Sequence, residues 1–442
     1  MRAPTQTVVV VLAVLAMGLP ALALDSSSPI DRSATASLTA QPVTPVAADV
    51  VTVFNSGNLR QTVLDRVATA ARASGAALAL GRSASVGMTA LYRGQQPVQV
   101  APAGFAYPMG TTVLSADVVA HTMGRNVSRL LAADSLIMSE VSAGLRGARP
   151  GDTAMLRSAS GAIVSLRVAA VLSADEVGGA ELLVSNEAGA RLGITRPTRA
   201  ILWGFRSRAA LDAALVANGL VSTAIRIRRS WDPPDPDATL GMAQAKATLG
   251  EFAYRVNADG TVSQDAAWLD TYLPAGRELL NDVIPIVARC HNAVKRAIRA
   301  ALAEVAAAGL AATLSVEDAN SYGGCHVARF NRLTPDSALG QLSRHSWAMA
   351  IDINTQGSCQ GCAPPDMDCR AVQIFRKHGF AWGGNFLVPD GMHFEWVGER
   401  RDSLSYPSRF CRNTAPAPLA LDAVEAGRSL LYADDGLTVG EH

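Results

Sequence analysis

The segments SRHSWAMAIDIN (residues 343–354) and GFAWGGNFLVPDGMHFEW (residues 379–396) carry the residues that decide the fold and chemistry of the C-terminal part of this chain. The chain has only seven histidines, and these segments place His345 near Asp352 and add His393. Two imidazoles and one carboxylate are a common ligand set for a catalytic zinc that leaves a fourth position open for water. The pattern therefore indicates a hydrolytic metal site. The alternative is a hydrogen-bonded loop histidine and a half-buried strand histidine.

The spacing within the first segment predicts a bend followed by a strand. Asp352 lies seven positions after His345, and on one continuous strand side chains at this spacing point to opposite faces. We therefore expect a loop at residues 343–346 and a buried strand at residues 348–354. Together they bring His345 back over the face that carries Asp352.

The second segment predicts a turn that leads into a strand. Pro389, Asp390 and Gly391 form a turn signal directly before an alternating run that starts at His393. The proline and the glycine make a helix improbable at this position. Asp390 is then a second carboxylate close to the ligands, where it can take a proton from water.

These residues resemble the VanY-like D-alanyl-D-alanine carboxypeptidase and L-alanyl-D-glutamate endopeptidase group of zinc peptidases. The signatures of the group read S-x-H-x-x-G-x-A-x-D and W-G-G followed by D-x-M-H-F-E. The matching residues here are Ser343, His345, Ala350 and Asp352, then Trp382, Gly383 and Gly384, then residues 390–395. The glycine of the first signature is Ala348 in this chain, which predicts an altered backbone approach near the first ligand.

The resemblance extends upstream and covers roughly the last third of the chain. In NSYGGCHVARF (residues 320–330), the tyrosine, glycines and arginine of the family correspond to Tyr322, Gly323, Gly324 and Arg329.

The resemblance implies a role for each candidate site residue. The implied Zn²⁺ ligands are His345, Asp352 and His393. Asp390 is the implied general base. Arg329 would bind a substrate carboxylate and Ser343 the substrate backbone, with a surface charge and a turn hydroxyl as the alternative roles. Glu395 would orient a ligand without contacting the metal, and it is the second candidate for the base.

The function implied by the resemblance is hydrolysis of bacterial cell-wall (peptidoglycan) stem peptides by an exported zinc metallopeptidase. D-alanyl-D-alanine carboxypeptidase is the leading activity. An L-alanyl-D-glutamate-type endopeptidase, a non-catalytic peptidoglycan-binding module and a structural partner of an export machine are the alternatives. The choice between carboxypeptidase and endopeptidase depends on how the cleft is closed, which the sequence does not show.

The N-terminus has the composition of an export signal. Residues 1–23 combine Arg2, an apolar run and an Ala-x-Ala cleavage site, and an uncleaved membrane anchor is the alternative. A cleaved signal predicts a secreted or cell-surface protein. The further expected parts are a flexible spacer at residues 24–48, an α+β domain of unknown role at 49–229, a linker and connecting segment at 230–273, a zinc peptidase domain at 274–411 and a tail at 412–442.

Hydrophobic periodicity predicts the α+β class. Residues 59–75 have helical spacing, and 286–308 form an alanine-rich amphipathic segment. A strand at 311–316 and a helix at 371–378 complete a small antiparallel sheet flanked by helices. No basic stripe with interleaved aromatic residues is present, so we expect no nucleic-acid partner.

All six cysteines fall in the expected peptidase domain. An even number in an exported protein favours disulfides. We expect Cys290 to pair with Cys325, and the pairing of the other four stays open. The alternative is a structural zinc site formed by Cys359, Cys362, Cys369 and Cys411.

Overall fold

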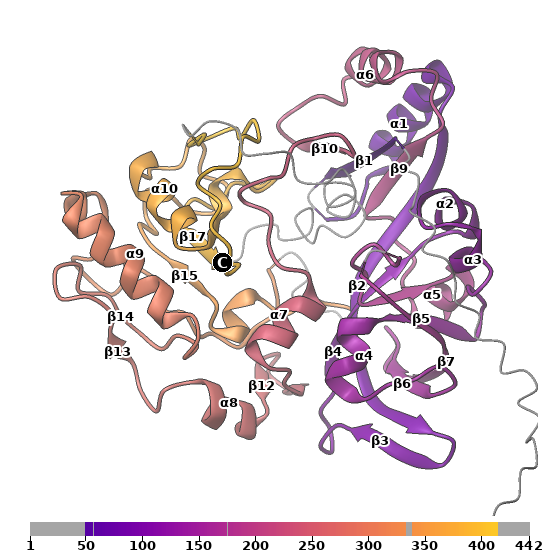
Figure 1. Cartoon of the computed structure of the whole chain (residues 1–442), viewed down its shortest axis with the longest axis horizontal. Helices are drawn as coiled ribbons and strands as arrows, with labels where there is room; N and C mark the ends of the chain where they lie inside the picture. The colour runs from indigo at the N-terminus through magenta and orange to yellow at the C-terminus, as the bar shows by residue number, and fades with distance from the viewer. Residues whose placement is uncertain (1–48, 56, 175, 333–337, 414–442) are drawn as a thin grey trace, which may run out of the picture. The chain divides into compact units, whose positions relative to one another are not determined.

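The computed structural model describes residues 49–55, 57–174, 176–332 and 338–413, and its fold is mixed α+β (Figure 1). The expected export signal and spacer, and the tail beyond residue 413, lie outside the described residues. Among the helices of the described part, none combines the length and apolar character that a membrane span requires.

The N-terminal part is built on a ten-stranded sheet in which six strands close into a barrel. Its strands are β1 (Val50–Asn55), β2 (Ala77–Arg93), β3 (Gln96–Val100), β4 (Tyr107–Val113), β5 (Ser135–Ser139), β6 (Thr153–Arg157), β7 (Ile163–Leu172), β8 (Leu182–Val184), β9 (Arg199–Trp203) and β10 (Ile225–Arg229). The long strand β2 pairs with β9 near its start and with both β4 and β6 further on. The ring β2-β4-β8-β5-β7-β6 is thereby closed, and buried apolar residues such as Met88, Leu156 and Leu182 belong to its core.

Helices cover both faces of the remaining strands β10-β1-β9. On one face α1 (Gln61–Ser74) and α6 (Arg208–Ala217) pack on a cluster that includes Val51 and Leu202. On the other face α2 (Ala116–Thr122) and α3 (Arg125–Ser128) contribute to a cluster with Ile201. The short helices α4 (Glu140–Arg146) and α5 (Asn186–Leu192) follow β5 and β8. An α+β arrangement was expected here, but a closed barrel was not.

The C-terminal part combines small antiparallel sheets with helices. Its elements are α7 (Met242–Leu249), β11 (Tyr254–Val256), β12 (Val262–Gln264), α8 (Ala266–Tyr272), β13 (Glu278–Leu279), β14 (Val287–Ala288), α9 (Lys295–Ala307), η1 (Ala311–Thr313), η2 (Arg344–Trp347), β15 (Ala350–Asp352), α10 (Cys369–Lys377), β16 (Phe380–Trp382), η3 (Gly383–Asn385) and β17 (His393–Trp396). The three-stranded sheet has the order β15-β17-β16 and is antiparallel. The ring centroid of Phe375 in α10 lies 5.4 Å from that of Phe380 and 4.3 Å from that of Phe394. These aromatic contacts pack the helix against the sheet.

Three expected elements of this part were wrong in extent or type. The helix expected from residue 286 begins at Lys295, because residues 287–288 pair with β13 instead. The strand expected at 311–316 is the 3-10 turn η1. The strand expected at 348–354 shortens to β15, because Ala348 and Asn354 have left-handed backbones with φ of 52° and 59°.

All six cysteines are bonded in pairs. The bond between Cys290 and Cys325 confirms the expected pairing. The other bonds are Cys359–Cys362 and Cys369–Cys411. A structural zinc site made of the last four cysteines is therefore excluded.

Removal of a long-range disulfide is expected to destabilise the protein more than removal of the short one. Cys290–Cys325 spans 35 positions and Cys359–Cys362 only 3. Since loop-closure entropy grows with loop length, replacing the first pair by alanine should lower the free energy of unfolding by about 2–4 kcal/mol, and replacing the second by less. Urea unfolding of both variants measures this difference. The reverse order of stability would contradict the expectation.

Candidate metal centre

Strands β15 and β17 bring Asp352 and His393 side by side. The two residues are partners in the antiparallel register, and His393 Nδ1 lies 3.1 Å from Asp352 Oδ1. His345 Nε2 lies 3.3 Å from the same carboxylate oxygen. All three residues are buried, and one ligand atom from each lies within 4.8 Å of the others. The structure thus gathers the three ligands expected from the sequence into one cluster.

The turn η2 holds His345 over the end of β15. Ser343 caps this turn, because its Oγ accepts a hydrogen bond from the backbone N–H of His345 at 3.1 Å. The His345 ring places Nδ1 3.1 Å from the carbonyl oxygen of Cys325. A carbonyl only accepts, so Nδ1 carries the proton and the lone pair is on Nε2, the atom facing Asp352. This is the tautomer that a metal-binding histidine needs.

The bend expected between His345 and Asp352 occurs at Ala348. Its backbone is left-handed (φ 52°), and its N–H donates to His345 O at 2.9 Å. The resembling family has glycine at this position, where a left-handed backbone carries no steric cost. Ala348 adopts this conformation without being glycine, and whether the backbone approach differs from that of the family stays a prediction.

A buried ion pair between Glu395 and Arg344 lies next to His393. Alternation along β17 puts His393 and Glu395 on one face, and Glu395 Oε2 lies 3.6 Å from His393 Nε2. Arg344 Nε lies 3.3 Å from Glu395 Oε1, and an Arg344 guanidinium nitrogen donates to Leu240 O at 2.6 Å. Glu395 is thus placed to orient the ring of His393 from outside the ligand cluster. The sequence reasoning missed Arg344, whose only signal was its position between Ser343 and His345.

Glycines hold Asp390 in a tight, fully buried turn. The Asp390 N–H donates to Gly383 O at 2.9 Å, and its carbonyl accepts from the His393 N–H at 3.2 Å. A Cβ on Gly383 would lie 2.5 Å from Asp390 O, and one on Gly391 would lie 2.3 Å from the side chain of Pro365. Only glycine fits at these two positions. The W-G-G and D-G residues therefore fix Asp390 next to His393.

Two arginines, Arg329 and Arg332, lie in the segment between Tyr322 and the turn η2. Arg329 runs alongside the ligand turn, since its carbonyl accepts from the Ser343 N–H at 2.9 Å. Burial and the neighbouring charge of Arg329 lower the pKa of Arg332, while Asp390 and Asp352 act in the opposite direction. Arg332 therefore lies within electrostatic reach of both carboxylates. Sequence reasoning picked Arg329 alone, because only that arginine belongs to the quoted signature.

Electrostatics favour the ionised form of the Asp352 carboxyl. Burial alone would raise the pKa of the Asp352 carboxyl, but His345 and His393 outweigh this and hold it well below its usual range. Burial lowers the pKa of the nearby His326 to about 4, helped by Arg289 and His345. His326 is therefore neutral near pH 7, and its Nε2 lies 2.7 Å from Gln264 Oε1.

A buried cluster of two imidazoles and a carboxylate, with a separate buried carboxylate three positions before one of them, has the side chains that a hydrolytic metal centre uses. Residues 337–396 match a family model described as D-alanyl-D-alanine carboxypeptidase. The matched stretch contains every candidate site residue except Arg329, and it confirms the resemblance for the C-terminal region. No curated protein matches the chain.

Proposed function

We propose that this protein is an exported zinc peptidase that hydrolyses cell-wall stem peptides as a D-alanyl-D-alanine carboxypeptidase. The buried cluster of His345, Asp352 and His393 is the observation that carries the proposal. The family match supports a peptidase. The three disulfides fit an oxidising compartment outside the cytoplasm.

Each side chain of the site has a separate role in amide hydrolysis. His345, Asp352 and His393 would hold the zinc ion, which lowers the pKa of a bound water to about 7 when present. The Asp390 carboxylate accepts a proton from the attacking water and later passes it to the nitrogen of the leaving amine. Glu395 keeps the His393 ring oriented. Ser343 acts through the turn that positions His345, rather than on substrate.

The arginines favour a substrate with a free C-terminus. Arg329 and Arg332 offer planar guanidinium groups, which bind carboxylates through paired hydrogen bonds. The charges of Asp390 and Asp352 act on the pKa of Arg332, and we place the terminal carboxylate of the substrate at this arginine. This placement favours a carboxypeptidase over an endopeptidase.

Mass spectrometry of purified muropeptides incubated with the zinc-loaded protein tests the proposal. Loss of one terminal alanine from pentapeptide stems is the expected result. Cleavage inside the stem would instead establish the endopeptidase, and binding without any cleavage would establish a peptidoglycan-binding module. The variant in which both His345 and His393 are alanine is the control for contaminating peptidases.

A further inference from the structure

Asp237 is a buried carboxylate that has no part in the reaction as described above. It belongs to the segment expected to connect the N-terminal domain with the peptidase domain, and it is only 3% exposed. Arg376 of α10, which is fully buried, pairs with it. Arg376 Nε lies 2.8 Å from Asp237 Oδ1, and Nη2 lies 2.5 Å from Oδ2. Because desolvation offsets much of the attraction within a buried ion pair, stability alone is a weak reason for such a group.

The same carboxylate accepts two hydrogen bonds from the ends of the turn η3 (Gly383–Asn385). The backbone N–H of Trp382, the residue directly before η3, donates to Asp237 Oδ1 at 3.0 Å. Asn385 Nδ2, at the end of η3, donates to Asp237 Oδ2 at 2.7 Å. With the bonds from Arg376, each oxygen accepts two hydrogen bonds, which is the capacity of a carboxylate. Asp237 therefore holds both ends of this turn.

Two further hydrogen bonds connect these residues to the backbone around Asp390. Gly383 O accepts the Asp390 N–H at 2.9 Å. On the other side of Asp390, the Trp382 indole N–H donates to Gly391 O at 2.7 Å. The residues that Asp237 holds are thus the residues that hold Asp390.

The residues that flank Asp237 are themselves bonded to other parts of the chain. Asp235 Oδ1 accepts the Asp237 N–H at 2.9 Å, and the Asp235 carboxylate pairs with Arg228 of β10. Arg401 Nη1 donates to Ala238 O at 2.8 Å. The backbone of Asp237 is therefore fixed independently of η3, as a group that positions this turn requires.

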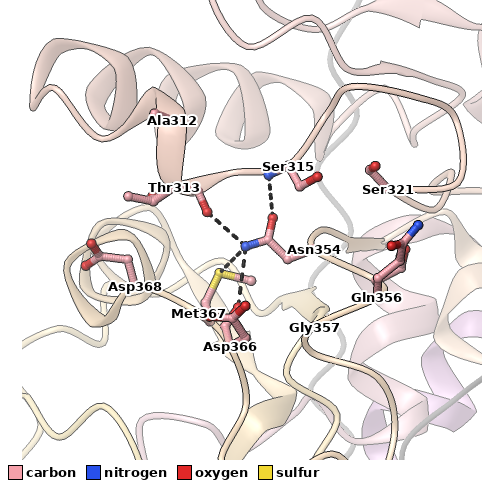
Figure 2. Close-up of a pocket in the computed structure, with 11 residues that line it drawn as sticks. Ala312, Thr313, Ser315, Ser321, Asn354, Gln356, Gly357, Asp366, Met367 and Asp368 are labelled. Carbon is pink, nitrogen blue, oxygen red and sulfur yellow. Dashed lines mark hydrogen bonds between the residues drawn. The ribbon is translucent and has the colours of Figure 1, made fainter.

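Asn354 also joins separate segments, but it does not contact η3 in this way. Figure 2 shows its side chain at the wall of a polar pocket of about 720 Å³. Its Oδ1 accepts from the Ser315 N–H at 2.6 Å, and its Nδ2 donates to Thr313 O at 2.9 Å. Residues 313–315 contain no candidate site residue. The contacts of Asp237 differ because they lead to both sides of Asp390.

We propose that Asp237 is a positioning residue for the candidate base Asp390. The inference rests on the proposed function and extends it, because Asp237 lies outside the residues 337–396 that match the family model. Asp237 acts through Trp382 and η3 and does not contact the reacting atoms. Since proton transfer requires the base within hydrogen-bond reach of the attacking water, a displaced Asp390 would slow the reaction.

Asp237→Asn tests this role. Asparagine has the same size, but its amide nitrogen cannot accept the bonds made to one carboxylate oxygen, and Arg376 loses its opposite charge. In the folded, zinc-loaded variant, kcat for D-alanyl-D-alanine peptides should fall about 10- to 100-fold, because Asp390 is displaced. KM should change little, because Arg329 and Arg332 belong to another segment. Zinc content should equal that of the parent protein, because the three ligands are unchanged.

Asp152→Asn is the matched control. Asp152 is 1% exposed, and Arg93 Nε and Nη2 each lie 2.9 Å from one of its two carboxylate oxygens. It also accepts the Arg149 N–H at 2.8 Å, but it lies directly before β6 of the barrel. The same chemical change at this position should lower the melting temperature and leave kcat unchanged.

Asn385→Ala is a second variant that keeps the ion pair between Asp237 and Arg376. It removes one bond to Asp237 and the side-chain bonds of Asn385 to the backbone of Phe410. Its kcat should fall by about tenfold. This variant decides the inference if Asp237→Asn does not fold.

Amide hydrogen exchange provides a measurement that does not depend on activity. The N–H groups of Trp382, Phe386 and Asp390 are hydrogen-bonded in the parent protein and should exchange slowly. Mass spectrometry should find exchange over residues 382–391 about tenfold faster in Asp237→Asn and in Asn385→Ala. Exchange over these residues should be unchanged in Asp152→Asn.

The outcomes separate the inference from the proposed function. A folded, zinc-loaded Asp237→Asn that has the kcat of the parent protein, or unchanged exchange over residues 382–391, would overturn the inference and leave the peptidase intact. An equal loss of kcat in Asp152→Asn would also overturn it, because lower stability would then explain both variants. If the parent protein cleaves no peptide, the carboxypeptidase fails, and hydrogen exchange decides the inference alone.

Discussion

Replacing His345 and His393 together by alanine is expected to remove the metal and the hydrolysis of D-alanyl-D-alanine peptides at the same time. The double variant retains only Asp352 of the three clustered ligands, and one carboxylate does not hold zinc in competition with water. Elemental analysis should find about one zinc per chain in the parent protein and none in the variant. Activity should fall to background.

His121→Ala provides the matched control for this experiment. His121 is exposed on α2 in the N-terminal part, so its removal should change neither zinc content nor activity. Circular dichroism of the double variant establishes whether the fold is kept. A correctly folded double variant with an unchanged zinc content would refute the metal centre.

The ligand cluster was predictable because its signals are local. The turn at Pro389 and Gly391 and the alternation from His393 are properties of a few consecutive residues, and β17 starts at His393 as expected. The need for a bend between His345 and Asp352 follows from strand geometry alone. The structure provides that bend through η2 and the left-handed Ala348.

The barrel was not predictable, because its closure depends on pairing between distant residues. Leu91 of β2 pairs with Ala154 of β6, and no local pattern encodes such a contact. The first half of β2 is also rich in alanine, glycine and serine, which have weak strand preference. Local patterns identified helix α1, whereas the central strand of the sheet had no clear signal.

The supporting groups of the metal centre were hidden for a similar reason. Arg344 meets Glu395 only after η2 and β17 are folded against each other. Arg332, whose pKa the charge of Asp390 raises, belongs to a different segment of the chain. The spacing of residues in the sequence identifies metal ligands that share a motif. The side chains around these ligands come together only through tertiary packing. The contacts of Asp237 with Trp382 and Asn385 belong to the same category.

The variant Asp390→Asn is expected to lose turnover while keeping its zinc. Asparagine retains the size and shape of the buried side chain, and the backbone bonds of Asp390 to Gly383 and His393 do not depend on the carboxylate. The three metal ligands are untouched. A general acid–base group typically supplies ~10²- to 10⁴-fold in rate, so kcat should fall by about that factor. KM should change little, because the proton moves only along the reaction path.

Glu395→Gln distinguishes the base from the residue that orients His393. Glu395 lies beside His393 Nε2 and pairs with Arg344, so its neutralisation should weaken zinc binding by about 10- to 100-fold. Asp390→Asn should leave zinc affinity unchanged. If Asp390→Asn cleaves as fast as the parent protein at equal zinc content while zinc-saturated Glu395→Gln does not, Glu395 is the base. If the parent protein binds cell-wall peptide but cleaves none between about pH 5 and 9, Asp390 has no proton to transfer, and the C-terminal region is a binding module.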